Sequence, residues 1–376
     1  MTDQNIVEPK LMFPKRLDSI DALRGFDMLM ISGGGEFIHL LGGLTGIGII
    51  DAIAGQFYHP EWHGFTFFDF IFPLFLFLAG TSLAFSVTVG KSKGLSNANI
   101  TKKVAKRMVI LMLLGILFKN APVDIFDPGH IRYGSVLGRI GIATFLVTLL
   151  YLRFSWQQRL YIGLGVLVSY YLLLLIIPVP GFGAGNLTFE GNLIGWLDRA
   201  IMPGKLKQTT YDELAISTQI PAACLTLFGS LAGDILLSDQ QGNAKMKRLL
   251  TMGIIGIAVG LLWNFIFPIN KHLWSSSFVL LTAGMASLLL AGFYWIIDIK
   301  GKRRWSFFFR VIGVNSLLIY LTTRFVDFNE TSRLLFSGIY KYASEPWQEV
   351  FNALGGFALV WLFLYVMYRN KLFLKV

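Results

Sequence analysis

The sequence predicts an all-α fold: a polytopic integral membrane helix bundle of about ten transmembrane helices with both termini in the cytoplasm. Three observations lead to this prediction. Hydrophobic residues make up 54% of the 376 positions and charged residues only 15%, whereas soluble proteins carry roughly 25% charged residues. Long apolar stretches recur along most of the chain. Lys and Arg are concentrated in every second connection between them.

The same composition excludes several classes of protein. So few charged residues argue against a soluble enzyme, a nucleic-acid-binding protein and a disordered chain. The net charge of +11 indicates membrane topology once the apolar stretches are taken into account, so we expect no nucleic-acid partner. The single cysteine, Cys224, excludes an internal disulfide and a CxxC metal site. Charged residues between Asp3 and Asp18 leave no apolar core for a cleavable signal peptide.

Ten stretches have about the 20 mostly apolar residues that a helix needs to cross a bilayer. They are residues 20–42, 64–89, 104–120, 134–152, 158–178, 214–237, 248–268, 273–297, 305–325 and 348–368. The first is the weakest, because Arg24, Asp27 and Glu36 interrupt it. We find no internal repeat, so we expect residues 1–376 to form a single transmembrane domain.

The charge of the connections tests this number independently. If the N-terminus is cytoplasmic, the connections on that side carry more than twice as many Lys and Arg as the opposite ones. The positive-inside rule then places both termini in the cytoplasm, and an odd number of spans would break the alternation. The outer connections 43–63, 179–213 and 326–347 are the long ones, and all five histidines lie in outer loops or the outer part of a span. Such loops often carry function.

The segment HPEWHGFTFFDFIFP, residues 59–73, carries the clearest chemical pattern. His59 precedes a span that contains an acid, Asp69, about two turns inside the membrane. Histidine titrates near neutral pH and can exchange a proton with an amine or a hydroxyl, so His59 is a candidate general base. A carboxylate at this depth needs a partner or a water-filled cavity. The alternative is an interfacial loop histidine and a structural ion pair.

A metal site is a second interpretation of the histidines. Glu36 and His39 are three residues apart and share one helix face, and His59 and His63 could join them. Pro60 disfavours helical geometry between the two loop histidines, and zinc sites need three or four well-spaced ligands. We therefore expect no metal and keep Glu36, His39 and His63 as candidate substrate-binding residues.

The first span holds two unusual features. Asp21, Arg24 and Asp27 are spaced three apart on one helix face. We expect an internally neutralised cluster that holds this helix to its neighbours, with a proton relay as the alternative. The Ser-Gly-Gly-Gly run at residues 32–35 predicts a break in the outer half of the helix. Non-helical backbone at membrane depth must face protein or a cavity.

Two later spans place polar groups inside the membrane. Arg139 lies in the fourth span, where an arginine pairs with an acid or an anionic ligand; a cofactor phosphate and Asp69 are both candidates. In the ninth span, Asn315 and Ser316 follow Gly313, and hydrogen bonds between helices are their default interpretation. We also consider Asp69, Asn315 and Ser316 as candidate cofactor contacts.

The segment at residues 270–275 opens the eighth span at the outer face. Its hydrogen-bond donors and its aromatic ring together suit a sugar, whereas an aromatic belt with a snorkelling lysine is the alternative. The candidate substrate-binding residues here are Asn270, Lys271, Trp274 and Ser275.

Taken in order, these segments resemble a known family, the transmembrane acetyl-CoA:glucosaminide N-acetyltransferases, whose lysosomal member acetylates the terminal glucosamine of heparan sulfate. The resemblance is carried by RLDSIDALR (16–24), SGGG (32–35), HPEWHGFTFFDFIFPLFLFLAG (59–80), IRYGSVLGRIG (131–141), VPG (179–181), GWLDR (195–199), YDE (211–213), PINKHLWSSS (268–277) and GVNSLLIY (313–320). The His-x-x-Trp-x-Gly block with its following FxFxDFIFP is the most specific.

The resemblance implies an integral membrane enzyme that moves acetyl from cytosolic acetyl-CoA to the amine of a glucosamine-type sugar at the outer side of the membrane. It implies that His59 is the catalytic residue, as base or as acetyl carrier, and that Arg139 contacts the cofactor or supports the fold. Bacterial relatives imply a location in the inner membrane. Ile31 replaces a family asparagine, and Thr323-Arg324 replaces a His-Glu pair. The lysosomal member's large lumenal domain is also expected to be absent.

Two other functions remain open at this point. An amino-sugar transporter would also use glycine-broken helices and polar residues near the outer face. A non-catalytic scaffold would leave the outer histidines and the intramembrane charges unexplained. A homodimer is the assembly we expect by analogy with soluble oligomers.

Overall fold

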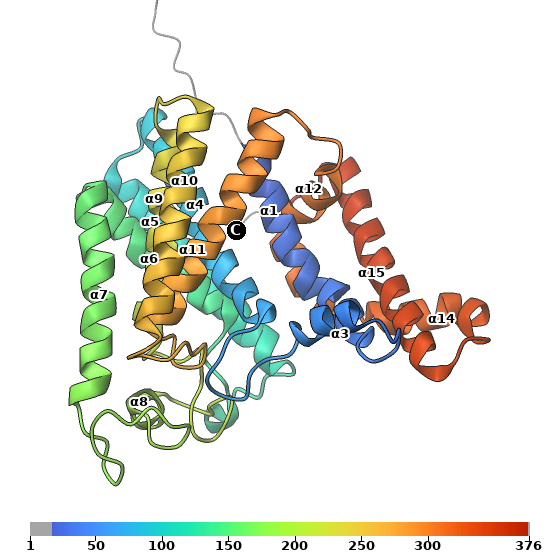
Figure 1. Ribbon diagram of the computed structural model, residues 1–376, viewed down its shortest axis with the longest axis horizontal. Coiled ribbons are helices and arrows are strands. Elements are labelled where there is room, and N and C mark those ends of the chain that lie inside the picture. Colours follow the sequence, from blue (N-terminus) through green and yellow to red (C-terminus); the bar gives the residue numbers. More distant parts are fainter. Residues whose placement is uncertain (1–16, 375–376) are drawn as a thin grey trace, which may run out of the picture.

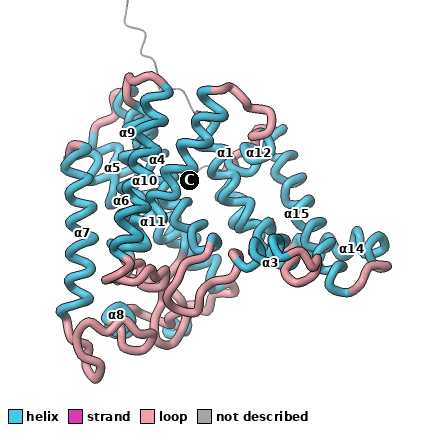
Figure 2. Tube along the Cα trace, in the orientation of Figure 1, coloured by secondary structure: helices cyan, strands magenta, loops and turns pink. Residues whose placement is uncertain are grey.

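A computed structural model describes residues 17–374, and within that range helices form all of the regular structure, without a β-strand (Figure 2). The all-α class predicted from the sequence is therefore confirmed. The elements are α1 (Asp18–Leu29), the π-helical turn η1 (Met30–Gly34), α2 (Gly35–Leu40), α3 (Gly48–Gly55), α4 (Phe67–Ser92), α5 (Asn97–Asn120), the short η2 (Pro128–His130), α6 (Val136–Arg153), α7 (Trp156–Ile176), α8 (Leu193–Ile201), α9 (Gln219–Leu237), α10 (Gly242–Trp263), α11 (Ser276–Phe293), η3 (Tyr294–Ile299), α12 (Phe307–Gly313), α13 (Ser316–Phe325), α14 (Phe328–Tyr340) and α15 (Glu345–Arg369).

Within the described range, seven helical segments are long and apolar enough to cross a membrane. They are α4, α6, α7, α9, α10, α15 and the continuous segment formed by α11 and η3. The other three predicted spans also contain helices. However, α5 is strongly basic in its first half, and the first and ninth spans are each divided into shorter helices. The total of ten and the cytoplasmic termini stay predictions.

The break in the first span lies where the glycine run predicts it. Between α1 and α2, Gly33 has a φ of 124°, a left-handed conformation that glycine adopts at no steric cost. The Ser32 hydroxyl donates a hydrogen bond to the carbonyl oxygen of Met28 at 2.7 Å. The predicted interruption of this helix is therefore confirmed.

The charged face of α1 is neutralised only in part by its own residues. Arg24 Nη1 lies 3.4 Å from Asp21 Oδ1, and Arg24 Nη2 donates to Ser82 Oγ of α4 at 2.6 Å. Asp27 is buried, and neither of its carboxylate oxygens has a hydrogen-bond partner among residues 17–374. The expected cluster therefore joins Asp21 to Arg24, but it does not include Asp27 through a hydrogen bond.

The helices pack in two groups (Figure 1). One group contains α4, α5, α6, α7, α9, α10 and α11, and its closest pairs are α10 with α11, α4 with α9, and α5 with α6. In the other group α1 packs on α12, and α14 packs on α15. Contacts of α1 with α4 and α11 join the two groups.

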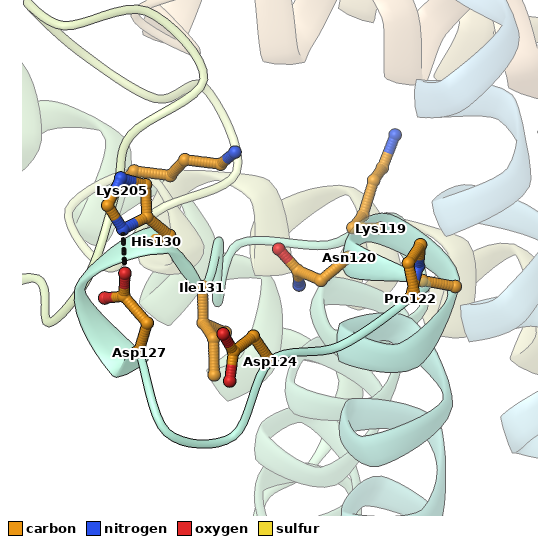
Figure 3. A pocket seen from close by; sticks show the side chains of 9 residues that line it. Lys119, Asn120, Pro122, Asp124, Asp127, His130, Ile131 and Lys205 are labelled. Carbon is orange, nitrogen blue, oxygen red and sulfur yellow. Dashed lines mark hydrogen bonds and ion pairs between the residues drawn. The ribbon is translucent and has the colours of Figure 1, made fainter.

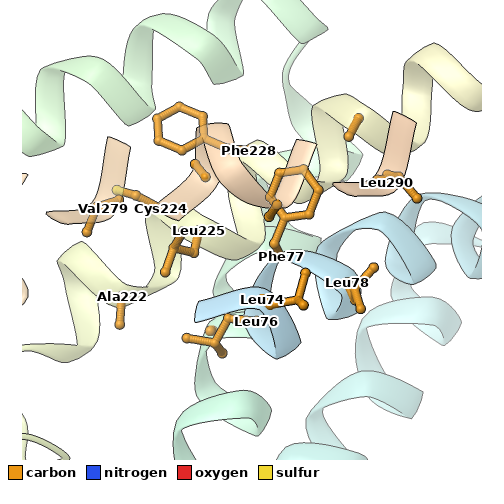
Figure 4. Packing of buried hydrophobic residues seen from close by; sticks show 14 of the residues in the cluster. Leu74, Leu76, Phe77, Leu78, Ala222, Cys224, Leu225, Phe228, Val279 and Leu290 are labelled. Atoms are coloured by element: carbon orange, nitrogen blue, oxygen red, sulfur yellow. The ribbon is translucent and has the colours of Figure 1, made fainter. Parts of the chain in front are cut away.

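The backbones of α4 and α9 approach closely within the larger group. A Cβ atom added to Gly80 would lie 1.9 Å from the carbonyl oxygen of Thr226, and one added to Gly229 would lie 1.9 Å from that of Phe77. Small residues permit such close backbone approach between membrane helices. Buried side chains of α4, α9 and α11 surround this contact, including Leu74, Leu225 and Val279 (Figure 4). This packing fixes α4, whose first turn carries Asp69.

Candidate active site

The loop before α4, the loop before α11 and the segment around α8 lie together at the lower end of the bundle in Figure 1. Trp62 joins the three. Its indole nitrogen donates to the carbonyl oxygen of Leu187 at 2.8 Å, and its ring stacks on His272 with centroids 5.4 Å apart. Predicted site residues from separate parts of the chain therefore meet here.

The central feature is a pair formed by His59 and Asp69. Asp69 lies in the first turn of α4, with its side chain only 1% exposed, whereas the His59 side chain is 44% exposed. Asp69 Oδ1 lies 2.7 Å from His59 Nδ1. Asp69 Oδ2 accepts hydrogen bonds from the Thr66 backbone N–H at 3.1 Å and from the Thr66 hydroxyl at 3.2 Å.

This arrangement determines the tautomer and the orientation of the His59 imidazole. A carboxylate at Nδ1 favours the tautomer that carries its proton there, which leaves the Nε2 lone pair free to accept a proton. Phe68 stacks on the imidazole with ring centroids 5.0 Å apart and so restricts its rotation. The pair has the geometry of a general base held by an orienting acid.

Lys271, in the loop before α11, completes the group. Its Nζ lies 3.2 Å from Asp69 Oδ1 and 3.4 Å from both ring nitrogens of His59. An atom equidistant from the two nitrogens cannot lie in line with the Nε2 lone pair, so that lone pair stays available. Three residues from two segments, all singled out in the sequence, therefore converge on one point.

The loop that presents Lys271 is a tight turn. The Asn270 side chain accepts from the Leu273 backbone N–H at 2.8 Å and donates to His63 Nδ1 at 3.1 Å. The Ser275 backbone N–H closes the turn on the carbonyl oxygen of Asn270 at 3.1 Å. Trp274 has a φ of 50°, an uncommon conformation for a bulky residue. Because Asn270, Trp274 and Ser275 are buried, they shape the turn and in this conformation present no surface to a sugar.

A second polar cluster adjoins the first through His272. Its Nδ1 lies 2.5 Å from the Tyr211 hydroxyl and 3.3 Å from Glu213 Oε2. Lys207 Nζ lies 2.5 Å from Glu213 Oε1. Burial by itself raises the pKa of Glu213, but the hydrogen bond from His272 and the Lys207 ammonium outweigh it and hold that pKa well below its usual range.

This pKa makes the stability of the outer loops depend on pH. A carboxyl whose pKa is lower in the folded protein stabilises it above the unfolded pKa of about 4.3. That contribution is lost as the pH falls further. We expect Glu213→Gln to destabilise the protein by about 1–3 kcal/mol at pH 7.

The difference in melting temperature between the wild type and Glu213→Gln should shrink as the pH falls from 5 to 3. Glu190→Gln, at an exposed position of the same outer connection, serves as the control and should leave the melting temperature unchanged. A difference for Glu213→Gln that stays constant over this pH range would contradict the assignment.

Arg139 is fully buried next to the turn that carries Lys271. It lies in the first turn of α6, 0% exposed, and its guanidinium carbon is 4.7 Å from the centre of the Trp274 ring. Its Nη2 donates to Thr218 Oγ1 at 2.5 Å. Its Nε and Nη1 and the Trp274 indole nitrogen have no hydrogen-bond partner among residues 17–374. Arg139 therefore forms a cation–π contact, rather than an ion pair with Asp69.

The other predicted site residues have partners elsewhere. Both carboxylate oxygens of Glu36 lie 3.3 Å from Asn329 Nδ2 of α14. The ring of His39 is 4.1 Å from that of Tyr58, the neighbour of His59. Within residues 17–374, no three His, Cys, Asp or Glu side chains are arranged to hold one metal ion.

Asn315 and Ser316 lie at the junction of α12 and α13. The Asn315 side chain donates to the carbonyl oxygen of Leu372 at 3.0 Å and accepts from the Leu374 backbone N–H at 3.4 Å. The junction therefore binds the chain that follows α15.

Sequence reasoning missed several residues of the site. The Thr66-x-x-Asp69 spacing is a capping-box pattern and could have placed Asp69 at the start of α4. No local signal could have paired Tyr211 and Glu213 with His272, because sixty residues separate them. An exposed pocket, lined by Lys119, Lys205 and His130 among others (Figure 3), also lies in the outer connections and was not anticipated.

The family described as heparan-alpha-glucosaminide N-acetyltransferase, catalytic, matches residues 16–261. The chain belongs to this family. The resemblance recognised in the sequence motifs is thereby confirmed, and the matched residues include His59, Asp69 and Arg139.

Two curated relatives agree with this family. Heparan-alpha-glucosaminide N-acetyltransferase of Homo sapiens is 27% identical over 428 residues, which cover 96% of this chain and 60% of the relative. The Mus musculus protein of the same name is 27% identical over 425 residues with the same coverage. The chain thus spans about 60% of the length of these relatives. Its family and its long apolar helices identify an integral membrane protein.

Proposed function

We propose that this protein is a membrane N-acetyltransferase that moves acetyl from cytosolic acetyl-CoA to the amine of a glucosamine-type sugar at the outer side of the membrane. The observation that carries the proposal is the 2.7 Å contact between His59 Nδ1 and Asp69 Oδ1. It supports a general base at the outer end of the bundle. The family, and relatives named for N-acetyl transfer to a glucosaminide, support the transferred group and the class of acceptor.

The chemistry follows from the free Nε2 of His59. As the sugar nitrogen attacks the thioester carbonyl carbon, Nε2 takes the proton that the nitrogen loses. The C–S bond then breaks, and the proton passes to the departing CoA sulfur. A positioned base of this kind contributes about 10²- to 10⁴-fold to the rate. In a second version Nε2 itself attacks the thioester, and the sugar amine then opens the acetyl-imidazole.

Delivery of the donor follows the proposed topology. Acetyl-CoA approaches from the cytoplasm, while His59 lies at the opposite end, so the pantetheine arm passes between helices. Basic cytoplasmic connections bind the nucleotide phosphates, and Asp69, Arg139, Asn315 and Ser316 remain the proposed contacts along the route. We place the protein in the bacterial inner membrane, as a homodimer.

The acceptor sugar would lie beside His59 at the outer surface. The partly exposed imidazole and the Lys271 ammonium lie together at this position. His63, Glu36 and His39 are the further proposed contacts with the sugar, and the His39 ring is 4.1 Å from that of Tyr58, the neighbour of His59. This supports a sugar that enters from outside without crossing the bilayer.

Labelled acetyl-CoA tests the function directly. The purified protein in lipid nanodiscs is expected to transfer radiolabelled acetyl to glucosamine, and mass spectrometry should place the acetyl group on nitrogen. N-acetylglucosamine, whose amine is blocked, is the negative control. If a panel of amino sugars yields no acetylated product, the proposal is wrong.

An amino-sugar transporter is the second candidate, because two helices are interrupted at membrane depth. Gly33 breaks the first span, and the ninth span is divided between α12 and α13 near Asn315. Discontinuous helices frequently bind transported substrates. Proteoliposomes that accumulate unmodified glucosamine without acetyl-CoA would favour this function over acetyl transfer.

A further inference from the structure

We propose that Lys271 is a catalytic residue whose ammonium donates a hydrogen bond to the thioester carbonyl oxygen and stabilises the oxyanion formed during transfer. The inference rests on the proposed N-acetyl transfer and adds a group that the His59–Asp69 pair does not supply. It assigns to Lys271 a role in the reaction rather than in holding the sugar.

The reaction needs a positive partner at this point. When the amine adds to the carbonyl carbon, the carbonyl oxygen gains a negative charge, and preorganised donors at that oxygen are a large part of catalysis. Asp69 is itself an anion, and His59 accepts the proton that the amine loses. Neither can stabilise the oxyanion.

Three backbone donors near the start of α4 already have protein acceptors. The Gly64 N–H donates to the carbonyl oxygen of Ile269 at 3.0 Å, and the Phe68 N–H donates to that of Gln56 at 3.0 Å. The Thr66 N–H donates to Asp69 Oδ2 at 3.1 Å. These three N–H groups therefore point at protein acceptors, whereas the adjacent Lys271 ammonium still has N–H groups that can donate to a ligand.

The distances allow one ligand to contact both groups. Lys271 Nζ lies 3.4 Å from His59 Nε2, so positions about 3 Å from both atoms exist beside them. A thioester carbonyl placed there has its carbon next to the amine that Nε2 deprotonates. An ammonium has three N–H donors. One points to Asp69 Oδ1 at 3.2 Å, and the others remain for the carbonyl oxygen.

The position of the ammonium is held by the fold. Lys271 is only 16% exposed, and the turn that carries it is closed by hydrogen bonds of Asn270 and Ser275. On the far side of the turn, the Tyr170 hydroxyl donates to the carbonyl oxygen of Leu273 at 2.7 Å. A donor fixed before the reaction needs no reorganisation when charge develops.

The transfer step uses the amine, the thioester, His59 and Lys271. The amine nitrogen forms a bond to the carbonyl carbon, and the C=O π electrons move to the oxygen, where Lys271 holds the charge. His59 Nε2 takes one proton from the nitrogen. The oxyanion then reforms the carbonyl, the C–S bond breaks, and His59 returns the proton to the CoA sulfur. Lys271 stays protonated throughout.

Lys271→Met in the full-length protein tests the role. We expect kcat for acetyl transfer to glucosamine to fall about 100-fold, with KM for both substrates little changed. Chloroacetyl-CoA separates catalysis from a purely structural role, because its electron-withdrawing group stabilises the oxyanion without help. With that donor the loss should shrink to about tenfold. Lys205→Met, at an exposed outer lysine, is the matched control and should behave as the wild type.

The outcomes distinguish failure of the proposed function from failure of the role assigned to Lys271. If wild-type protein is inactive with all amino sugars, the proposed function and this inference both fail. If the wild type is active but Lys271→Met retains its kcat, Lys271 has no role in the transfer step and the inference alone is overturned. An equal loss with both donors also overturns it, because Lys271 then acts only through Asp69. Should the methionine variant fail to fold, Lys271→Gln, which keeps a polar side chain, gives the same two-donor comparison.

Discussion

Replacing His59 with alanine should reduce acetyl transfer by up to about 10⁴-fold. The side chain supplies the proton acceptor in one version of the reaction and the nucleophile in the other, so both versions fail without it. The fold should survive, since the imidazole is 44% exposed and lies in a loop. Initial rates with labelled acetyl-CoA and glucosamine measure the effect, and the melting temperature confirms folding.

His130→Ala is the matched control for this variant. His130 also lies in an outer connection and is also within hydrogen-bond distance, 2.6 Å, of an aspartate, Asp127, but it should not be needed for transfer. A His59→Ala protein that keeps more than about a tenth of wild-type activity would contradict its role as base, which is worth at least about 10²-fold. Denaturing the wild type at neutral pH after exposure to labelled acetyl-CoA without sugar separates the two versions, because only an acetyl-histidine intermediate leaves label on the protein.

Asp69→Asn should cost about 10³- to 10⁴-fold in kcat/KM although it changes a single atom. Asparagine can donate from its amide nitrogen to His59 Nδ1, which favours the tautomer with the proton on Nε2. That nitrogen then has no lone pair for the incoming amine. The substitution also removes the anion that pairs with Lys271, so that Lys271 repels a protonated His59.

The measurements for Asp69→Asn are kcat/KM and its pH profile. The amide oxygen can still accept the hydrogen bonds of Thr66, so the first turn of α4 should remain capped. Asp127→Asn, at an exposed carboxylate paired with a histidine, is the control. If Asp69→Asn retained the activity of the wild type, the tautomer of His59 would not depend on this carboxylate, and the central pair would lose its proposed function.

Much of the site was visible in the sequence because its residues are local or chemically unusual. His59 and Asp69 lie ten positions apart at the start of an apolar stretch, and the glycine run predicted the break at Gly33. The role of Lys271 was not visible. It was selected as part of a sugar-binding segment, and only the packing of the α10–α11 loop against the start of α4 brings its ammonium to Asp69.

Burial also gives several residues a different environment from the one predicted. Trp274 and Asn270 are typical sugar-binding types, but the turn buries them and uses their hydrogen-bonding and packing capacity within the protein. Arg139 was expected to pair with an acid such as Asp69 or with a cofactor phosphate; it lies on the face of Trp274 rather than against Asp69, and the phosphate contact stays a prediction. The choice among such partners depends on contacts between distant segments, which residue type and spacing do not specify.

The sequence by itself determined the helical class, the approximate positions of the spans and the chemical types available at the outer end, because hydrophobic length and local charge pattern act over short stretches of chain. The tertiary structure decided which of those groups meet. Close packing of α4 against α9 and the turn before α11 place His59, Asp69 and Lys271 within one hydrogen-bonded group. Such contacts depend on the arrangement of whole helices, whose relative positions are fixed only when their surfaces pack together.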